Sequence, residues 1–134
     1  MKPLRSGSNV QARLAFPELV LEVDVRSARA FGSDIEALRD GVVGAIGIPT
    51  CEEPRAVTLL LSRVSEGDFY TRTSRHLRVL LSPEAVEHLL YKLNEITTAG
   101  GPSTPELGQF DAVDETGTPV LRRAQTLRVY LAAK

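Results

Sequence analysis

Alternating apolar and polar residues predict that much of this chain forms β-strands. Residues 19–25 read LVLEVDV, so one side of the segment is wholly apolar and the other carries Glu22 and Asp24. This period of two residues is typical of a strand with one buried face. Similar patterns, rich in strand-favouring residues, predict further strands in 9–16, 56–64, 69–81, 110–113, 119–121 and 126–132.

A first helix is predicted to begin at Ser33. Glu36 follows three positions later, and the two residues together form a capping box. Gly47, with a proline soon after it, gives a stop signal. Apolar residues recur at helical spacing between these signals, at Ile35, Leu38, Val42 and Ile46.

The second predicted helix has clearer local signals. Ser82 is a favourable N-cap, Pro83 occupies the first helical position, and Glu84 meets the positive end of the helix dipole. One apolar stripe runs along the helix, and its burial would make this helix the principal cover of the sheet. The stripe consists of Val86, Leu89, Leu90, Leu93 and Ile96.

From residue 19 the predicted order is strand, helix, strand, strand, helix, strand, strand. The first six elements match the β-α-β-β-α-β order of ferredoxin-like sandwiches. We therefore expect an α+β fold, in which two helices pack on one face of a mainly antiparallel sheet with additional N- and C-terminal strands. The 134 residues are expected to form a single domain, with a mobile start at 1–8 and a long flexible loop at 97–109.

Composition and charge argue against several classes of function. The formal net charge is −1, so the overall balance does not favour nucleic acid or an anionic membrane. The longest apolar runs, VTLLL and VVGAIGI, are too short to span a bilayer, and no apolar run of signal-peptide length follows the N-terminal basic residues. We expect a cytoplasmic protein without a membrane segment. The single cysteine excludes an intramolecular disulfide.

The residues most often used in catalysis do not form a convincing set. Cys51 directly precedes two glutamates, and neighbouring carboxylates disfavour the reactive thiolate. His76 and His88 have no partner at the spacing of metal ligands, although a zinc site needs three or four. Glu22 and Asp24 would project from one strand face roughly 7 Å apart, but solvated charges on a half-buried strand explain them as well. We predict no catalytic residue, metal or cofactor, and leave an enzymatic role open.

The densest local cluster of positive charge lies in residues 70–78, YTRTSRHLR. If the strand 69–81 is regular, Arg72, His76 and Arg78 project on the solvent face together with Tyr70, while Arg75 points the other way. Such a cluster would bind phosphates or an acidic patch on a partner. An equally simple interpretation is a charged, solubilising edge strand.

A run of acidic residues in the late hairpin would offset this cluster, within the chain or across a dimer. The run comprises Asp111, Asp114 and Glu115. The segments HLRVLL (76–81) and TLRVYL (126–131) resemble each other, but the match is too short to indicate a repeat. If either lies at a sheet edge, it would allow a homodimer through edge-strand pairing.

These observations favour a small non-enzymatic protein of a regulatory, accessory or immunity type, which acts by docking on a protein partner. The alternative is a binder of an anionic small molecule or nucleic acid through the Arg-rich strand 70–78. Recognition of RNA by aromatic residues on central strands is not matched, because 19–25 and 76–81 carry none.

Overall fold

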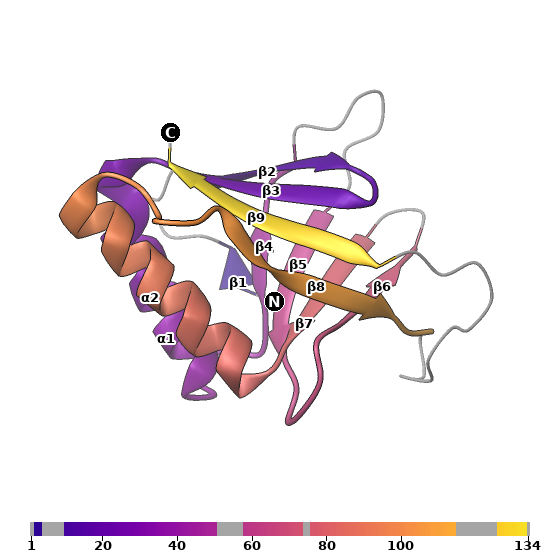
Figure 1. Ribbon diagram of the computed structural model, residues 1–134. Coiled ribbons are helices and arrows are strands. Elements are labelled where there is room, and N and C mark those ends of the chain that lie inside the picture. Colours follow the sequence, from indigo (N-terminus) through magenta and orange to yellow (C-terminus); the bar gives the residue numbers. More distant parts are fainter. Residues whose placement is uncertain (1, 4–9, 51–57, 74–75, 115–125, 134) are drawn as a thin grey trace.

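The computed structural model describes residues 2–3, 10–50, 58–73, 76–114 and 126–133 (Figure 1). Two α-helices and a short 3-10 helix (η1) accompany a nine-stranded sheet. In chain order the elements are β1 (Lys2–Pro3), β2 (Val10–Ala15), β3 (Glu18–Val23), η1 (Val25–Ser27), α1 (Ala28–Arg39), β4 (Ile46–Ile48), β5 (Thr58–Arg63), β6 (Phe69–Arg72), β7 (His76–Leu81), α2 (Pro83–Ala99), β8 (Glu106–Ala112) and β9 (Leu127–Ala133).

The sheet is mixed, which corrects the expectation of a mainly antiparallel sheet. Its strands are ordered β1-β4-β5-β7-β6-β8-β9-β3-β2, and parallel and antiparallel pairs alternate from one edge to the other. The predicted single strand 69–81 is in fact the hairpin of β6 and β7. At its turn the Thr73 backbone N–H donates to the His76 carbonyl (2.9 Å). Because the chain reverses there, β7 lies parallel to β5.

The sheet curls until its two edges nearly meet, so the fold is not an open ferredoxin-like sheet. The Ala12 N–H in β2 donates to the Pro49 carbonyl just after β4 (2.9 Å), and Ala12 forms a parallel bridge with Thr50. The contact continues the alternation of parallel and antiparallel pairs around a near-closed barrel. Near-closure satisfies backbone groups that an open edge would expose.

The strands 76–81 and 126–131 lie inside the sheet rather than at an edge. β7 is paired with β5 and β6, and β9 is paired with β8 and β3. Their backbone groups already pair within the sheet, so neither strand has the edge position on which the expected edge-strand pairing depended.

The first helix is displaced toward the N-terminus from its predicted position. Asp24 caps η1 by accepting from the Arg26 backbone N–H (2.7 Å), and α1 follows directly. Ser33 is therefore inside α1, and its hydroxyl donates to the Arg29 carbonyl (3.3 Å) instead of capping a helix. The helix ends at Arg39, ahead of Gly41 with φ of 76°, so Ile46 belongs to strand β4.

The second helix agrees closely with its prediction. The Ser82 hydroxyl accepts from the Ala85 backbone N–H (3.1 Å), and Pro83 opens the helix. The helix continues to Ala99 and ends at Gly100, which is left-handed with φ of 84°. Four residues of the predicted stripe are buried and Leu90 is half-buried; the four are Val86, Leu89, Leu93 and Ile96.

The connection predicted for 97–109 is shorter than expected. Because α2 runs to Ala99 and β8 begins at Glu106, only residues 100–105 join them. The side chain of Lys92, which is 1% exposed, donates from Nζ to the carbonyl (2.5 Å) and hydroxyl (2.9 Å) oxygens of Thr104. Within the predicted mobile start, Lys2–Pro3 form β1, and the rest of 1–8 lies outside the described residues. The predicted strand 119–121 also lies outside them.

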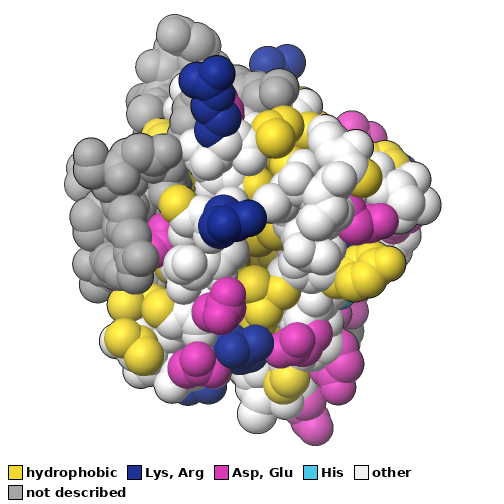
Figure 2. Space-filling view, turned by 90° about the vertical axis from the view of Figure 1, so that its left-hand side faces the viewer, with side chains coloured by type: hydrophobic (Ala, Val, Ile, Leu, Met, Phe, Trp, Pro, Cys, Tyr) yellow, Lys and Arg dark blue, Asp and Glu magenta, His cyan; other side chains and the backbone are white. Residues whose placement is uncertain are grey.

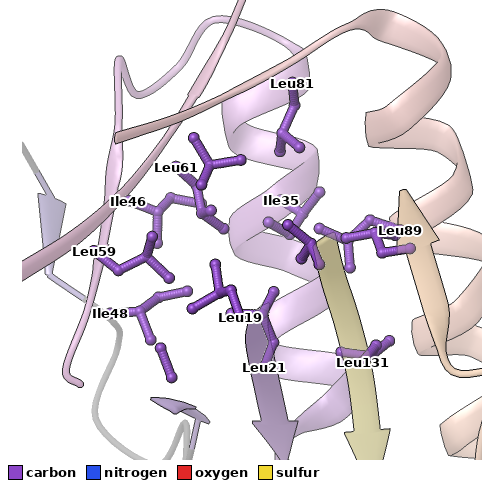
Figure 3. Packing of buried hydrophobic residues seen from close by; sticks show 14 of the residues in the cluster. Leu19, Leu21, Ile35, Ile46, Ile48, Leu59, Leu61, Leu81, Leu89 and Leu131 are labelled. Carbon is purple, nitrogen blue, oxygen red and sulfur yellow. The ribbon is translucent and has the colours of Figure 1, made fainter. Parts of the chain in front are cut away.

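Both helices lie side by side against the concave face of the curled sheet (Figure 1). Figure 3 shows how inward side chains of the strands meet those of the helices in one apolar core. Ile35 of α1 and Leu89 of α2 face Leu19 of β3 and Leu59 of β5 across this core, and all four are fully buried. The prediction that the helices cover one face of the sheet is confirmed, and apolar side chains fill the space beneath them.

The chain contains an internal structural repeat that the sequence did not reveal. Two strands, a helix and two strands make up 10–63, and the same order makes up 69–133. Each pairing in the first half has its counterpart in the second: β2–β3 matches β6–β7, and β4–β5 matches β8–β9. Between the halves, β5–β7 matches β9–β3. Strands of each half therefore pair with strands of the other half, and an approximate two-fold axis relates the two halves.

Core positions correspond between the two halves in residue type as well as in location. Seven buried apolar residues of β3 and α1 correspond to seven buried apolar residues of β7 and α2, and the buried charged residues Asp34 of α1 and Lys92 of α2 also occupy corresponding positions. The resemblance between 76–81 and 126–131 does not mark this repeat, because β7 corresponds to β3 and β9 to β5. The matched pairs are Leu19/Leu77, Leu21/Val79, Val23/Leu81, Ala28/Val86, Phe31/Leu89, Ile35/Leu93 and Leu38/Ile96.

Candidate functional site

The Arg-rich cluster predicted in 70–78 is divided by the β6–β7 turn. Tyr70 and Arg72 belong to the inward-facing register of β6, and Tyr70 is only 4% exposed. The rings of Tyr70 and Phe16 meet edge-on, with their centroids 5.9 Å apart. The Arg72 guanidinium lies over the Phe16 ring, 4.3 Å from its centroid. This contact is a cation–π interaction at the end of the barrel. The prediction that Tyr70 faces solvent is wrong.

The environment of Tyr70 keeps its phenol protonated. Burial raises the pKa of Tyr70 above its usual value, the positive charge of Arg72 opposes the shift, and the carboxylate of Asp111 adds to it. Asp111 lies on β8 beside β6, so the acidic hairpin does adjoin the Arg-rich segment. Among the described residues no ion pair joins Asp111 to Arg72 or Arg78.

His76 and Arg78 remain together on the outer face of the sheet, as predicted. They line a hollow of about 250 Å³ with Leu60, Thr71 and Thr73. Arg75 lies outside the described residues, as do Cys51 and Glu115. Two of the predicted binding residues, His76 and Arg78, therefore share one surface, whereas Tyr70 is buried and Arg72 is exposed over Phe16 at the end of the barrel.

Glu22 of β3 and Asp24, which follows that strand, serve structural contacts. Glu22 forms an ion pair with Arg13 of β2 (3.3 Å), and Asp24 caps η1. His88 is exposed on α2. In the parts of the chain that the structure describes, no group of three or more His, Cys, Asp or Glu residues could hold a metal ion.

A second hollow, of larger volume, lies between α1 and α2 on the side of the helices that faces away from the sheet. This groove has a volume of about 640 Å³, and residues of both helices form its walls. Figure 2, which looks onto the helices, shows hydrophobic side chains within the hollow and charged side chains around it. Leu90 and Leu93 supply apolar surface, and Gly32 of α1 leaves the opposite wall open. We call this hollow the helical groove.

One end of the helical groove holds a satisfied network of charges. The guanidinium of Arg39, at the end of α1, forms an ion pair with Glu87 of α2 (3.3 Å). It also forms ion pairs with Glu36 of α1 (3.9 Å) and with Asp40, the residue that follows the helix (3.0 Å). The hydrogen bond and charge of Asp40 raise the pKa of Arg39 most strongly, burial opposes the shift, and Glu87 adds to it. Arg63 donates to the Arg39 carbonyl (2.8 Å) and thereby satisfies the helix end.

The opposite end of the helical groove carries an uncompensated positive charge. Arg29 of α1 is exposed there with Asn94 and Thr98 of α2. Its guanidinium forms no ion pair or hydrogen bond within the described part of the chain. Tyr91 at the rim is 62% exposed, and its ring is accessible from solvent. The groove therefore combines an apolar floor, an exposed aromatic ring and one available cation.

Sequence reasoning missed the helical groove because its walls come from helices far apart in the chain. Two signals pointed to it: Tyr91 lies outside the apolar stripe of α2, and Gly32 interrupts an otherwise good helix. Neither signal identifies a groove until the two helices are placed side by side.

The chain matches no protein-family model, and neither a curated protein nor a solved structure is detectably similar to it. No helix among the described residues has the length and apolar character needed to cross a membrane. Any functional argument therefore depends on the geometry of the sites themselves.

Proposed function

We propose that this protein is a non-enzymatic binding protein, of a regulatory, accessory or immunity type, which docks a protein partner in the helical groove. The observation that carries the proposal is the groove itself, at about 640 Å³ and open along the two helices. Its mixture of apolar floor and polar rim is the usual anatomy of a docking surface. Exposed tyrosine is enriched at such surfaces, where it anchors the partner.

The chemistry of the groove selects an acidic, amphipathic partner segment. Arg29 is the charge that remains available, because Arg39 is already held by Glu36, Asp40 and Glu87. A carboxylate on the partner would form a charge-assisted hydrogen bond with the Arg29 guanidinium. Charge complementarity of this kind selects partners and sets their orientation.

A helix is the partner segment that best suits the shape of the groove. A third helix would lie along the channel between α1 and α2 and place its apolar ridge against Leu90. Helix-in-groove recognition uses apolar side chains spaced at i, i+3, i+4 and i+7. The absence of a side chain at Gly32 leaves room for one of these anchors, since a Cβ there would meet nothing within 4 Å.

The proposal is tested by affinity capture from the native host with matched variants. Gly32→Trp fills the groove, and Arg29→Glu reverses its available charge. Arg128→Glu is the control, because Arg128 is exposed on β9, away from the helices. A true partner is retained by the wild-type protein and by the control, and its affinity for either groove variant falls at least about tenfold.

Mass spectrometry then identifies the retained protein, and calorimetry with a peptide of its docking segment measures the affinity. Equal retention by the wild-type protein and Gly32→Trp would contradict docking in the groove. So would a captured protein whose affinity depends on Arg128 as strongly as on Arg29, because that result indicates non-specific charge attraction.

A further inference from the structure

The outer face of the sheet, opposite the helices, carries a second hollow with different chemistry. The register of three neighbouring strands sets Leu60 of β5, Arg78 of β7 and Thr71 of β6 in one row. His76 lies two residues before Arg78 on the same face. Together with Thr73, these residues surround about 250 Å³. We call this hollow the outer pocket.

The outer pocket offers hydrogen-bond donors around an apolar floor. Leu60 is 7% exposed although it points away from the main core, so it forms the floor. None of the five lining residues is acidic. Arg78 forms no ion pair with any other described residue, which leaves its guanidinium available.

Beside the outer pocket, hydrogen bonds join Thr73 after β6 to His76 at the start of β7. The Thr73 hydroxyl accepts from the backbone N–H of His76 (3.0 Å), and the Thr73 backbone N–H donates to the His76 carbonyl (2.9 Å). These bonds hold the start of β7 against the end of β6, and His76 and Arg78 line the pocket from the same face of β7. A preorganised pocket loses less entropy on binding than one that must form around its ligand.

We propose that the outer pocket binds a small organic anion, a carboxylate or phosphate monoester with a short apolar group. The planar guanidinium of Arg78 suits two oxygens of such an anion, and the Thr71 hydroxyl and His76 ring supply further donors. The apolar group lies on Leu60. The volume admits a single ring with its acidic group and is smaller than the pockets that hold drug-sized ligands.

The composition of the pocket disfavours a nucleic-acid strand as the ligand. Proteins that bind single strands combine a long cationic groove with aromatic platforms for the bases. The outer pocket contains one arginine, and none of its lining residues is phenylalanine, tyrosine or tryptophan. This inference is independent of docking in the helical groove, because the two sites lie on opposite faces of the sheet.

The test is titration of the ¹⁵N-labelled protein with phenyl phosphate, benzoate and inorganic phosphate, followed by amide chemical shifts. Phenyl phosphate and benzoate are expected to shift amides of β6 and β7 saturably. Inorganic phosphate is expected to bind at least about tenfold more weakly, because it has no apolar group to cover Leu60. Arg78→Gln is expected to weaken phenyl phosphate binding at least about tenfold.

Two further variants make the test specific. Arg128→Gln removes an exposed arginine from β9 and is expected to leave the affinity unchanged. Thr71→Val keeps the side-chain shape without the hydroxyl and is expected to weaken binding about three- to tenfold. Thermal melts check that each variant is folded.

Several results would overturn the proposal. These are no saturable shift with either organic probe, equal affinity for inorganic and phenyl phosphate, or the same loss from Arg128→Gln as from Arg78→Gln. If a short oligothymidylate binds more tightly than phenyl phosphate and its affinity falls steeply with salt, the ligand of the pocket is a polyanion and not a small anion.

Discussion

Replacement of Gly32 by alanine tests whether the helical groove is open where α1 borders it. The residue lies inside α1, and its backbone does not have the positive φ that would require glycine. A Cβ built there meets no atom within 4 Å apart from its own helix backbone and chain neighbours. The substitution therefore introduces no clash, and its effect comes from the better helix propensity of alanine.

The expected result is a gain of about 1 kcal/mol in the free energy of unfolding, the usual difference between glycine and alanine in a helix interior. For a chain of this size the gain corresponds to a rise of about 3–6 °C in Tm. Urea unfolding followed by circular dichroism measures the free energy, and an unchanged m-value shows that the unfolding transition is the same.

Gly100→Ala is the matched control with the opposite expected sign. This glycine also has nothing within 4 Å of a built Cβ, but its φ is 84°. Alanine in the left-handed conformation costs about 1–2 kcal/mol. If Gly32→Ala destabilises the protein, the wall of the groove is not open there, and docking against it loses its geometric basis.

Three further predictions concern the packing and the repeat. Gly67→Ala is expected to cost about 2–4 kcal/mol in urea unfolding, more than Gly100→Ala, because its φ is 79° and a Cβ would overlap a phenylalanine ring. Lys92→Met is expected to keep the free energy of unfolding within about 1 kcal/mol of the wild type, because the Thr104 carbonyl can be hydrated. Lys92→Ala is expected to lower it by about 2–4 kcal/mol, and equal losses from the two variants would contradict this. Fragments 1–65 and 66–134 are expected to be unfolded alone and to form a 1:1 complex when co-expressed, as gel filtration and circular dichroism would show; a fragment that folds alone as a monomer would contradict this.

Local signals predicted the elements whose structure depends on local interactions. The Ser82 cap, the proline after it and the apolar stripe specify α2 almost residue by residue, because the helix satisfies its own backbone and needs only an apolar surface to cover. The alternation of apolar and polar residues predicted β3 and β9 equally well. In the first helix an internal Ser-x-x-Glu pattern predicted the helix N-terminus at the wrong position, because the actual N-terminus follows Asp24 and η1.

The remaining features depend on interactions that the local pattern does not contain. Between β6 and β7 the sequence has Ser74 but no glycine, proline, asparagine or aspartate, so only a weak turn signal is present. One missed turn changed the predicted direction of Tyr70 and the orientation of β7. The near-closure of the barrel depends on the contact of Ala12 in β2 with Pro49 and Thr50, and the sheet itself depends on pairing between β3 and β9 at opposite ends of the chain. The helical groove required the same long-range information.

The repeat explains why the helical groove has two chemically different ends. Matched positions of α1 and α2 line its walls, yet their residue types differ: Arg29 corresponds to Glu87, and Glu36 corresponds to Asn94. The apolar residues that α1 buries in the core correspond to apolar residues that α2 buries there. The two-fold arrangement is therefore kept where packing requires it and is lost along the groove. A segment bound there meets a free cation at one end and an ion-paired network at the other, so only one direction of binding satisfies both ends, and an asymmetric partner suits the groove better than a symmetric second copy.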